Sequence, residues 1–226
     1  MIDYGEEKQT CGAPKIDVGP VAQVLTALYL GGAVAAFFAP REVCDALAQI
    51  NAGLPRRFWT LLTGTWVFPE SFEEFARVPS GFWVVVTFLL VFFVVRPVEL
   101  VWKDRPGFLL FLLVFMAGPS LLLWALDPAG QEVTASWPFW FSAASGLAAV
   151  FFHRRRLRVA GRAVPQSFFY AAVPLAAAAS SFFNGGFVRG GLYLLWALLG
   201  ALWGFAVLCR ERERLCAKNA DPTQEH

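Results

Sequence analysis

Ser145 and His153 are the two side chains of this 226-residue chain that could first be considered for nucleophilic chemistry. Ser145 follows two alanines and precedes Gly146 inside an apolar segment, and His153 comes eight residues later. A serine hydroxyl is a poor nucleophile until a base removes its proton. Eight helical residues cover about 12 Å, whereas a base must lie within ~3 Å of the hydroxyl. We therefore do not expect His153 to activate Ser145, and His226 lies in a charged tail.

The four cysteines give no sign of a metal or redox site. They stand at positions 11, 44, 209 and 216, with no CxxC pair and no histidine-rich segment beside them. Zinc sites combine such residues at short and regular spacings. We expect free thiols, no metal site and no cofactor. The small net charge of +2 gives no reason to expect a nucleic-acid partner.

Glu99 is an acidic residue at the end of a long apolar run. Gly81 to Val95 carries no charge, and Arg96, Glu99 and Lys103 follow it. A carboxylate at mid-bilayer costs up to ~3 kcal/mol, but Arg96 and Lys103 are spaced to reach Glu99 on one helical face. We expect Glu99 to tie its helix to neighbouring segments, with a proton-relay or substrate role as the alternative.

The elements that would position these residues are apolar helices. The chain is 57% hydrophobic and only 16% charged, whereas soluble domains average about 25% charged residues. A helix needs roughly 20 mostly apolar residues to cross a bilayer. This pattern predicts an all-α, multi-pass membrane protein with a six-span domain over 20–209, between tails at 1–19 and 210–226. The predicted spans are 20–39, 81–102, 108–126, 137–152, 168–183 and 192–209.

The distribution of positive charge predicts the orientation of these spans. Basic residues gather in cytoplasmic segments of membrane proteins. Alternate connections of the six-span arrangement differ strongly, and the sparsely charged side holds only Arg41, Arg56, Arg57, Arg77 and Arg189. Both termini should therefore be cytoplasmic, and a bacterial inner membrane is our working assumption. The run from Arg154 to Arg162 is interpreted mainly as a topology determinant that would also attract anionic lipids.

Small and aromatic residues suggest how the spans pack. Gly200 and Gly204 form a GxxxG pattern that lets helix backbones approach closely, and Ser145 with Gly146 suits the same role. The aromatic set consists of Trp59, Trp66, Trp83, Trp137 and Trp140. The simplest interpretation is an interfacial belt, and the alternative is a lateral opening through which a transmembrane client could enter.

Three local motifs resemble the rhomboid-like superfamily over roughly residues 20–209. Pro55-Arg56-Arg57-Phe58-Trp59-Thr60-Leu61-Leu62-Thr63 is similar to the start of the interfacial first loop in rhomboids and derlins. Pro97-Val98-Glu99-Leu100-Val101-Trp102 is similar to the family signature at the end of the second span, without its glycines. Gly200-Ala201-Leu202-Trp203-Gly204 matches the GxxxG of the sixth span. The resemblance implies a six-helix membrane bundle.

The resemblance also shows what this chain lacks. Rhomboid proteases pair the serine of a GxSG motif with a histidine just before the GxxxG. Here Ala143 replaces the first glycine, and Trp196 and Ala197 stand where the base would be. Trp83 and Thr87 stand about where the family has oxyanion-binding His and Asn, and losing one such donor typically costs about 10²–10³ in rate. The resemblance therefore implies a rhomboid pseudoprotease, or a remote relative that never had the chemistry.

Four functional hypotheses follow from the sequence. The first is a non-proteolytic rhomboid-like protein that binds or scaffolds other transmembrane segments. The second is a serine protease that uses Ser145 with an unidentified base. The third, a transporter or channel, requires ionisable residues facing a central path, and the spans carry almost none. The fourth is an accessory membrane subunit, which the sequence does not separate from the first. Oligomeric state is left open.

Overall fold

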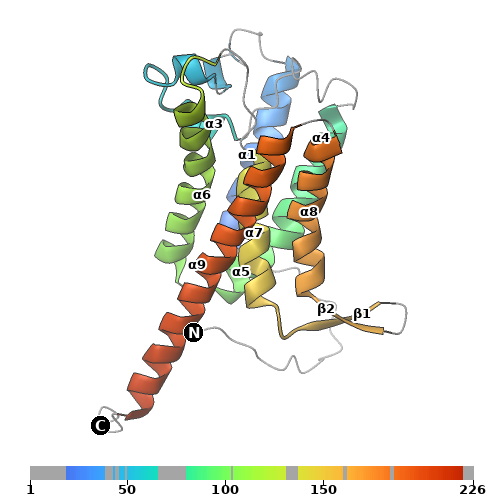
Figure 1. The fold of residues 1–226 in the computed structure, drawn as a ribbon, viewed down its shortest axis with the longest axis vertical. Helices are drawn as coiled ribbons and strands as arrows, with labels where there is room; N and C mark the ends of the chain where they lie inside the picture. Colours follow the sequence, from blue (N-terminus) through green and yellow to red (C-terminus); the bar gives the residue numbers. More distant parts are fainter. Residues whose placement is uncertain are drawn as a thin grey trace.

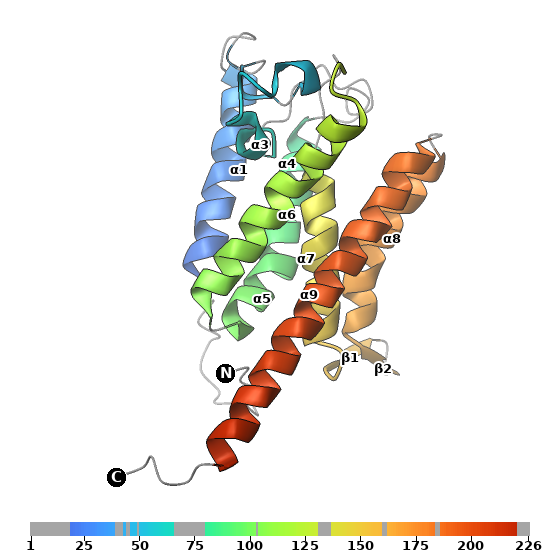
Figure 2. The same ribbon diagram turned by 60° about the vertical axis from the view of Figure 1, so that its left-hand side comes forward.

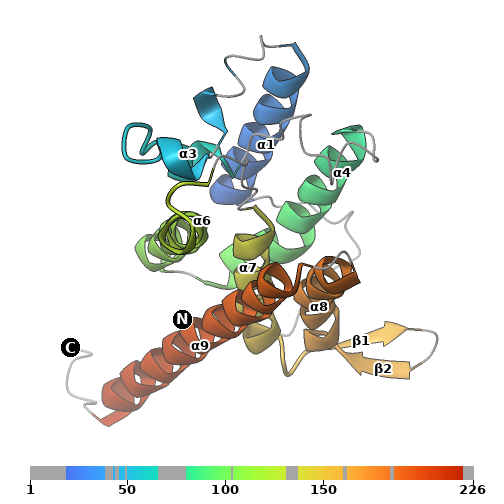
Figure 3. The same cartoon turned by 45° about the horizontal axis from the view of Figure 1, so that its top comes forward.

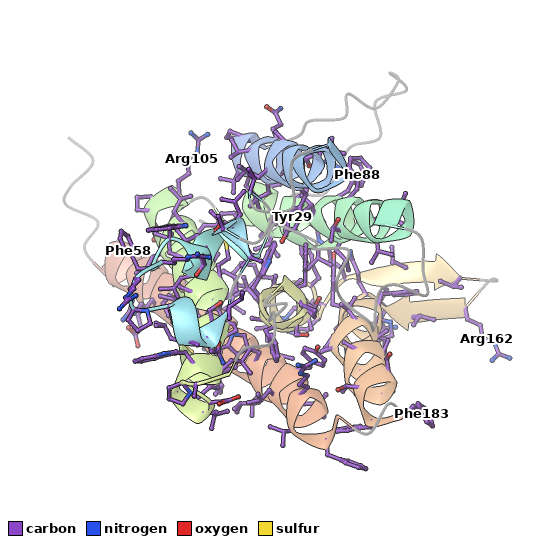
Figure 4. The ribbon with its side chains drawn as sticks, turned by 90° about the horizontal axis from the view of Figure 1, so that it is seen from above. Tyr29, Phe58, Phe88, Arg105, Arg162 and Phe183 are labelled. Atoms are coloured by element: carbon purple, nitrogen blue, oxygen red, sulfur yellow. The ribbon has the colours of Figure 1, made fainter. Side chains whose placement is uncertain are left out.

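The computed structural model of the chain is mostly helical, and the helix that carries Ser145 lies among the other helices (Figure 4). The structure describes residues 19–38, 43, 46–48, 50–65, 80–102, 104–130, 137–159, 162–183 and 186–220, and the side chains of 33–38, 80–84, 137, 158 and 214–220 are not part of that description. The predicted tail before residue 19, about half of the connection from 41 to 79, and His226 lie outside the described residues.

Seven helices of the described chain form the body of the molecule. They are α1 (Pro20–Phe38), α4 (Ser80–Leu90), α5 (Arg96–Val101), α6 (Arg105–Leu126), α7 (Trp137–Phe151), α8 (Ser167–Phe183) and α9 (Phe187–Ala220). Shorter elements are the 3₁₀ turn Asn51–Gly53, the helix α3 (Thr60–Thr63), and the strands β1 (Arg156–Val159) and β2 (Arg162–Pro165). α7 packs against α9, α8, α6 and α5, so it is the shared partner at the centre of the bundle (Figure 3).

Helices α4 and α5 are joined without a break by the π-helical turn Val91–Val95. Pro97 has no N–H to donate to the carbonyl one turn earlier, which in this sequence belongs to Phe93. A wider turn directly before a proline is a usual way to keep such a helix continuous. The apolar run predicted as one span over 81–102 is therefore helical throughout residues 80–101, with one widened turn.

Two helices among the described residues are long and apolar enough to cross a membrane. They comprise Arg105–Leu126 and Phe187–Glu213, and two shorter apolar helices cover Pro138–Phe151 and Ser167–Phe183. This supports a helical membrane protein in the coarse sense, and the number of spans remains a prediction from the sequence.

The ends of α6 are well supported. The Asp104 carboxylate accepts a hydrogen bond from the Gly107 N–H at 3.2 Å and caps the first turn. At the other end, the Asn51 side-chain amide donates to the carbonyls of Leu123 and Asp127, at 3.1 and 2.9 Å. The Leu123 carbonyl also accepts from the Asp127 N–H at 3.1 Å. Carbonyls at the very end of a helix lack intrahelical partners, so Asn51 caps this end at Asp127 and attaches the first connection to α6.

Helix α9 continues well past the predicted end of the sixth span at Cys209. It runs through the charged stretch Arg210 to Glu213 and ends at Ala220, extending beyond the other helices (Figures 1 and 2). Arginine and glutamate are good helix formers, and the alternation of charge in this stretch places opposite charges at i, i+3, as in Arg210 and Glu213. The predicted boundary at residue 209 thus falls inside one helix.

The Arg154 to Arg162 run, expected to be a loop, contains half of a β-hairpin. β1 and β2 pair antiparallel, with Arg156 opposite Pro165 and Val159 opposite Arg162. The hairpin projects from the bundle where α7 ends and α8 begins (Figure 3). The sequence signal is the alternation of Arg156, Leu157, Arg158 and Val159, which is the period of a strand; the high arginine content obscured it.

The interior and the surface of the bundle have an unusual division of polarity. Large apolar side chains are exposed on α1, α4, α6, α8 and α9, such as Val24, Phe88, Leu110, Phe183 and Phe205. Phe88 and Phe183 point away from the helices in Figure 4, whereas Tyr29 points inward. Several small polar residues are buried instead, and among the described residues they are Asn51, Thr60, Thr65, Thr87, Ser120, Ser142 and Ser145.

Candidate functional site

The site with the strongest functional interpretation is the contact between α7 and α9, where small residues bring two backbones together. A methyl group added at Gly146 would overlap the carbonyl oxygen of Ala197, and one added at Gly200 would overlap that of Ala143. Gly204 lies against Leu147, whose side chain a methyl would meet at 2.9 Å. Only glycine allows helix backbones to approach this closely. The three glycines singled out in the sequence therefore lie at one helix–helix contact.

Ser145 belongs to α7 and is fully buried, with 0% of its surface exposed. Its Oγ has no hydrogen-bond partner among the described residues. A buried hydroxyl without a partner carries a desolvation penalty of about 1–3 kcal/mol. A catalytic serine instead needs a base at hydrogen-bond distance. The described surroundings of Ser145 supply none.

His153 is placed where it cannot act on Ser145. It follows the C-terminal end of α7, is exposed, and donates from Nδ1 to the carbonyl oxygen of Val150 at 2.7 Å. A carbonyl oxygen can only accept, so Nδ1 carries the proton. The ring therefore caps the C-terminal end of its own helix at Val150, which is more than one turn beyond Ser145.

Trp196 and Ala197, which stand where a base was expected, pack against neighbouring helices. The Trp196 ring packs edge-on against Phe115 of α6, with centroids 6.5 Å apart, and lies close to Gly118. Its Nε1 is buried and has no hydrogen-bond partner among the described residues. Ala197 presents its carbonyl to Gly146. An indole N–H can only donate, so neither residue can replace a histidine base.

The opposite side of α7 is held by aromatic side chains. Trp140 Nε1 donates to the Tyr29 hydroxyl of α1 at 2.8 Å, and the two rings stack with centroids 6.3 Å apart. Both residues are buried. The expectation that Trp140 belongs to an interfacial belt is therefore wrong, because its ring lies in the core. The sequence holds no signal for this pair, which joins residues 111 positions apart.

The remaining tryptophans of the expected belt are only partly described. Trp59 is partly exposed, and its Nε1 donates to the Ala46 carbonyl at 3.2 Å. Trp66 lies outside the described residues, as do the side chains of Trp83 and Trp137. The lateral opening that this set could line therefore rests on the sequence. Thr87, at the expected place of an oxyanion-binding residue, is buried.

Glu99 lies on α5 and binds the N-terminal end of α1. Its two carboxylate oxygens accept hydrogen bonds from the backbone N–H groups of Val21 and Ala22, each at 2.8 Å. Gly19 leaves room for the carboxylate, since a methyl there would overlap it. The first N–H groups of a helix lack intrahelical partners and carry a partial positive charge. Glu99 thus caps α1 from another helix, a partner that its spacing to Arg96 and Lys103 did not suggest.

No group of three or more His, Cys, Asp or Glu residues that could hold a metal ion occurs in the part of the chain that the structure describes. Chemically, the contact between α7 and α9 therefore offers a buried hydroxyl and close helix packing.

Comparisons of the chain with protein-family models, curated proteins and solved structures found no match.

Proposed function

We propose that this chain is a rhomboid-like integral membrane protein that does not cleave peptide bonds and that binds or scaffolds the transmembrane segments of other proteins. The observation that carries the proposal is the contact between α7 and α9. There Gly146, Gly200 and Gly204 pack closely around a buried Ser145 for which the described residues supply no base. Such a site retains a scaffold without the chemistry of a serine hydrolase.

The surface of the bundle supports a location in lipid. Monomeric soluble proteins rarely expose contiguous apolar patches of more than a few hundred Å², whereas here the helices around α7, namely α1, α4, α6, α8 and α9, expose large apolar side chains. In a bilayer these side chains face lipid of equal polarity, and small residues mediate the contacts between helices. Six spans, with α4 and α5 forming one of them, agree with this division of polarity.

The placement of basic residues supports cytoplasmic termini. The hairpin, the start of α6 and the charged end of α9 lie at one end of the bundle (Figure 2). The described arginines at that end include Arg96, Arg105, Arg156, Arg162 and Arg210. The opposite end carries Arg56, Arg57 and Arg189. This asymmetry is what cytoplasmic and outer sides of a membrane protein display, and a bacterial inner membrane is the proposed location.

The buried polar residues weigh against transport. A polar path through a membrane needs ionisable side chains that face it. Among the described residues, every buried polar side chain is an uncharged Ser, Thr or Asn. We therefore do not favour a transporter or channel.

The first test is cleavage of a generic transmembrane substrate by the full chain in liposomes, with Ser145→Ala as the matched control. The proposal expects the same background cleavage, within error, for both proteins. Cleavage that disappears in Ser145→Ala would overturn it and reinstate a serine protease whose base remains to be found.

The second test concerns clients. A photoreactive amino acid in place of Trp59, which is partly exposed, should crosslink to transmembrane segments of other proteins in native membranes. The same group in place of Phe183, which is 92% exposed at the end of α8, controls for contact with any neighbouring protein. Equal products at both positions, or none at position 59, would contradict client binding there and favour an accessory subunit.

A further inference from the structure

We propose that the hairpin formed by the strands Arg156–Val159 and Arg162–Pro165 docks anionic phospholipid headgroups of the leaflet at the basic end of the bundle, and that its register gathers apolar side chains on one of its faces. The inference rests on the membrane location proposed above. It concerns a part of the chain that the rhomboid-like interpretation does not use, since the hairpin is away from Ser145.

The charge of this segment is high and unbalanced. Between His153 and Gln166 the chain carries five arginines and no acidic residue. Arg154, Arg156 and Arg162 are exposed, and none of the three forms an ion pair with an acidic side chain among the described residues. Arginine presents a planar fork of donors that suits phosphate oxygens. Topology alone would not require such charges to be held on an ordered element.

The pairing of the strands gives the hairpin two different faces. Directly opposed residues share a face of an antiparallel pair, and neighbours along a strand alternate. Leu157 is opposite Val164, and Val159 is opposite Arg162, so these four share one face. Leu157 and Val159 are 42% and 45% exposed. Arg156, opposite Pro165, lies on the other face and is exposed.

The hairpin sits where the apolar surface of the bundle begins. Phe168 and Phe169, in the first turn of α8 directly after it, are 66% and 45% exposed. Exposed Phe rings form apolar surface that would face acyl chains, and here that surface begins next to the hairpin. An amphipathic element at this level can turn its apolar side chains toward acyl chains. Arg156 on the other face, and Arg162 at the end of the apolar face where the second strand begins, would then reach phosphates. Arg162 points away from the helices (Figure 4), so it is free of packing within the bundle.

The base of the hairpin is held by specific contacts. The Gln166 N–H donates to the Arg155 carbonyl at 2.8 Å, and the Gln166 side chain donates to the Tyr170 hydroxyl at 3.0 Å. The Arg155 guanidinium lies over the Phe152 ring, 5.1 Å from its centroid. These contacts anchor the hairpin to α7 and α8, so its charges are presented in a fixed position, which lowers the ordering cost of binding.

The experiment measures phosphatidylglycerol binding by the full chain in detergent, using native mass spectrometry across a lipid titration. The test variant is Arg154→Gln/Arg156→Gln/Arg162→Gln. The matched control, Arg105→Gln/Arg210→Gln/Arg212→Gln, removes the same charge at the same end of the bundle. One basic residue near an anionic surface contributes about fivefold to binding, so the hairpin variant should bind at least about tenfold more weakly, and the control much less so.

Three outcomes would overturn the assignment. They are an equal loss in both triple variants, equal binding of phosphatidylcholine by the unaltered chain, and full displacement of the lipid by inorganic phosphate at the lipid's own concentration. Tighter binding of an acidic peptide than of phosphatidylglycerol would likewise overturn it, in favour of a protein partner.

A second variant tests the apolar face while keeping every charge. The Leu157→Ser/Val159→Ser variant should bind phosphatidylglycerol more weakly than the unaltered chain, because the acyl chains of the lipid lose their contact with these two apolar side chains. Unchanged binding would overturn the two-faced arrangement.

Carbonate extraction of cell membranes distinguishes failure of the hairpin assignment from failure of the proposed membrane location. If carbonate releases the chain, the membrane location itself is refuted. If the chain is retained but the hairpin variants bind phosphatidylglycerol as well as the unaltered chain does, only the hairpin assignment is refuted.

Discussion

The two sides of α7 are attached to the bundle in opposite ways. Toward α9, Gly146 and Gly200 bring the backbones into contact, and side chains contribute little volume. Toward α1, the backbones stay apart, and Trp140 and Tyr29 bridge the gap with stacked rings and one hydrogen bond. The contact with α9 is therefore sensitive to any atom added at Gly146 or Gly200, whereas the contact with α1 is sensitive to loss of the Tyr29 hydroxyl or the Trp140 ring. The comparison teaches that a single helix can use both modes of attachment toward two different neighbours.

The largest expected effect comes from Gly146→Ala or Gly200→Ala. Each new methyl meets a backbone carbonyl, which cannot rotate away as a side chain can. Overpacking typically costs 1–3 kcal/mol, and we expect about 3 kcal/mol here, seen as a lower thermal unfolding midpoint in detergent. Gly31→Ala, with nothing within 4 Å of the added methyl, is the matched control and should gain slightly. Equal midpoints for Gly146→Ala and Gly31→Ala would show that the α9 side is not closely packed.

The next effect, about 2 kcal/mol, is expected for Tyr29→Phe. This change leaves the buried Trp140 N–H without its hydroxyl acceptor, and an unsatisfied buried donor costs about 1–3 kcal/mol. The measurement is thermal unfolding of Tyr29→Phe, Trp140→Phe and the double variant. Because the double variant leaves no indole donor unpaired, it should lose less than the sum of the single changes. Strict additivity would argue that the hydrogen bond does not link α1 to α7.

A smaller effect, about 1 kcal/mol, is expected for Glu99→Gln, which tests the other attachment of α1. The amide keeps one acceptor oxygen but loses the charge that favours the N-terminal end of α1. Hydrogen exchange at Val21 and Ala22 should accelerate, while exchange in α9 stays unchanged. Glu213→Gln, an exposed site on α9, serves as control. If both variants behave alike, the cap does not contribute to the stability of α1.

The last effect, for Ser145→Ala, is a gain in stability of about 1 kcal/mol, the lower end of the desolvation penalty of a buried hydroxyl without a partner. The alanine keeps the small volume required beside Gly146 and removes a hydroxyl that has no partner. Ser142→Ala is the contrast, since it loses the hydrogen bond from Ser142 Oγ to the Pro138 carbonyl at 2.8 Å. A clear loss of stability in Ser145→Ala would mean that its hydroxyl has a partner, such as a bound water.

Much of the fold could be predicted from local patterns. The helices that contain Phe108 and Phe168 begin within a few residues of their predicted starts, since apolar length and flanking charges fix such boundaries. The β-hairpin was missed, because arginine content dominated the interpretation of its alternation. The extension of α9 past Cys209 was missed too, because a charged segment was equated with a tail although its residues favour helix.

For the candidate site, the sequence by itself determined which residue types stand where. The sixth predicted span holds no histidine, and the glycines at positions 146, 200 and 204 predict close helix contact. Tertiary structure decided what each residue contacts. It placed Glu99 at the start of α1 and Trp140 against Tyr29. The reason is physical. Amino-acid composition and the spacing of apolar residues are local properties that can be read along the chain. Hydrogen bonds between residues far apart in sequence depend on how the helices pack in space.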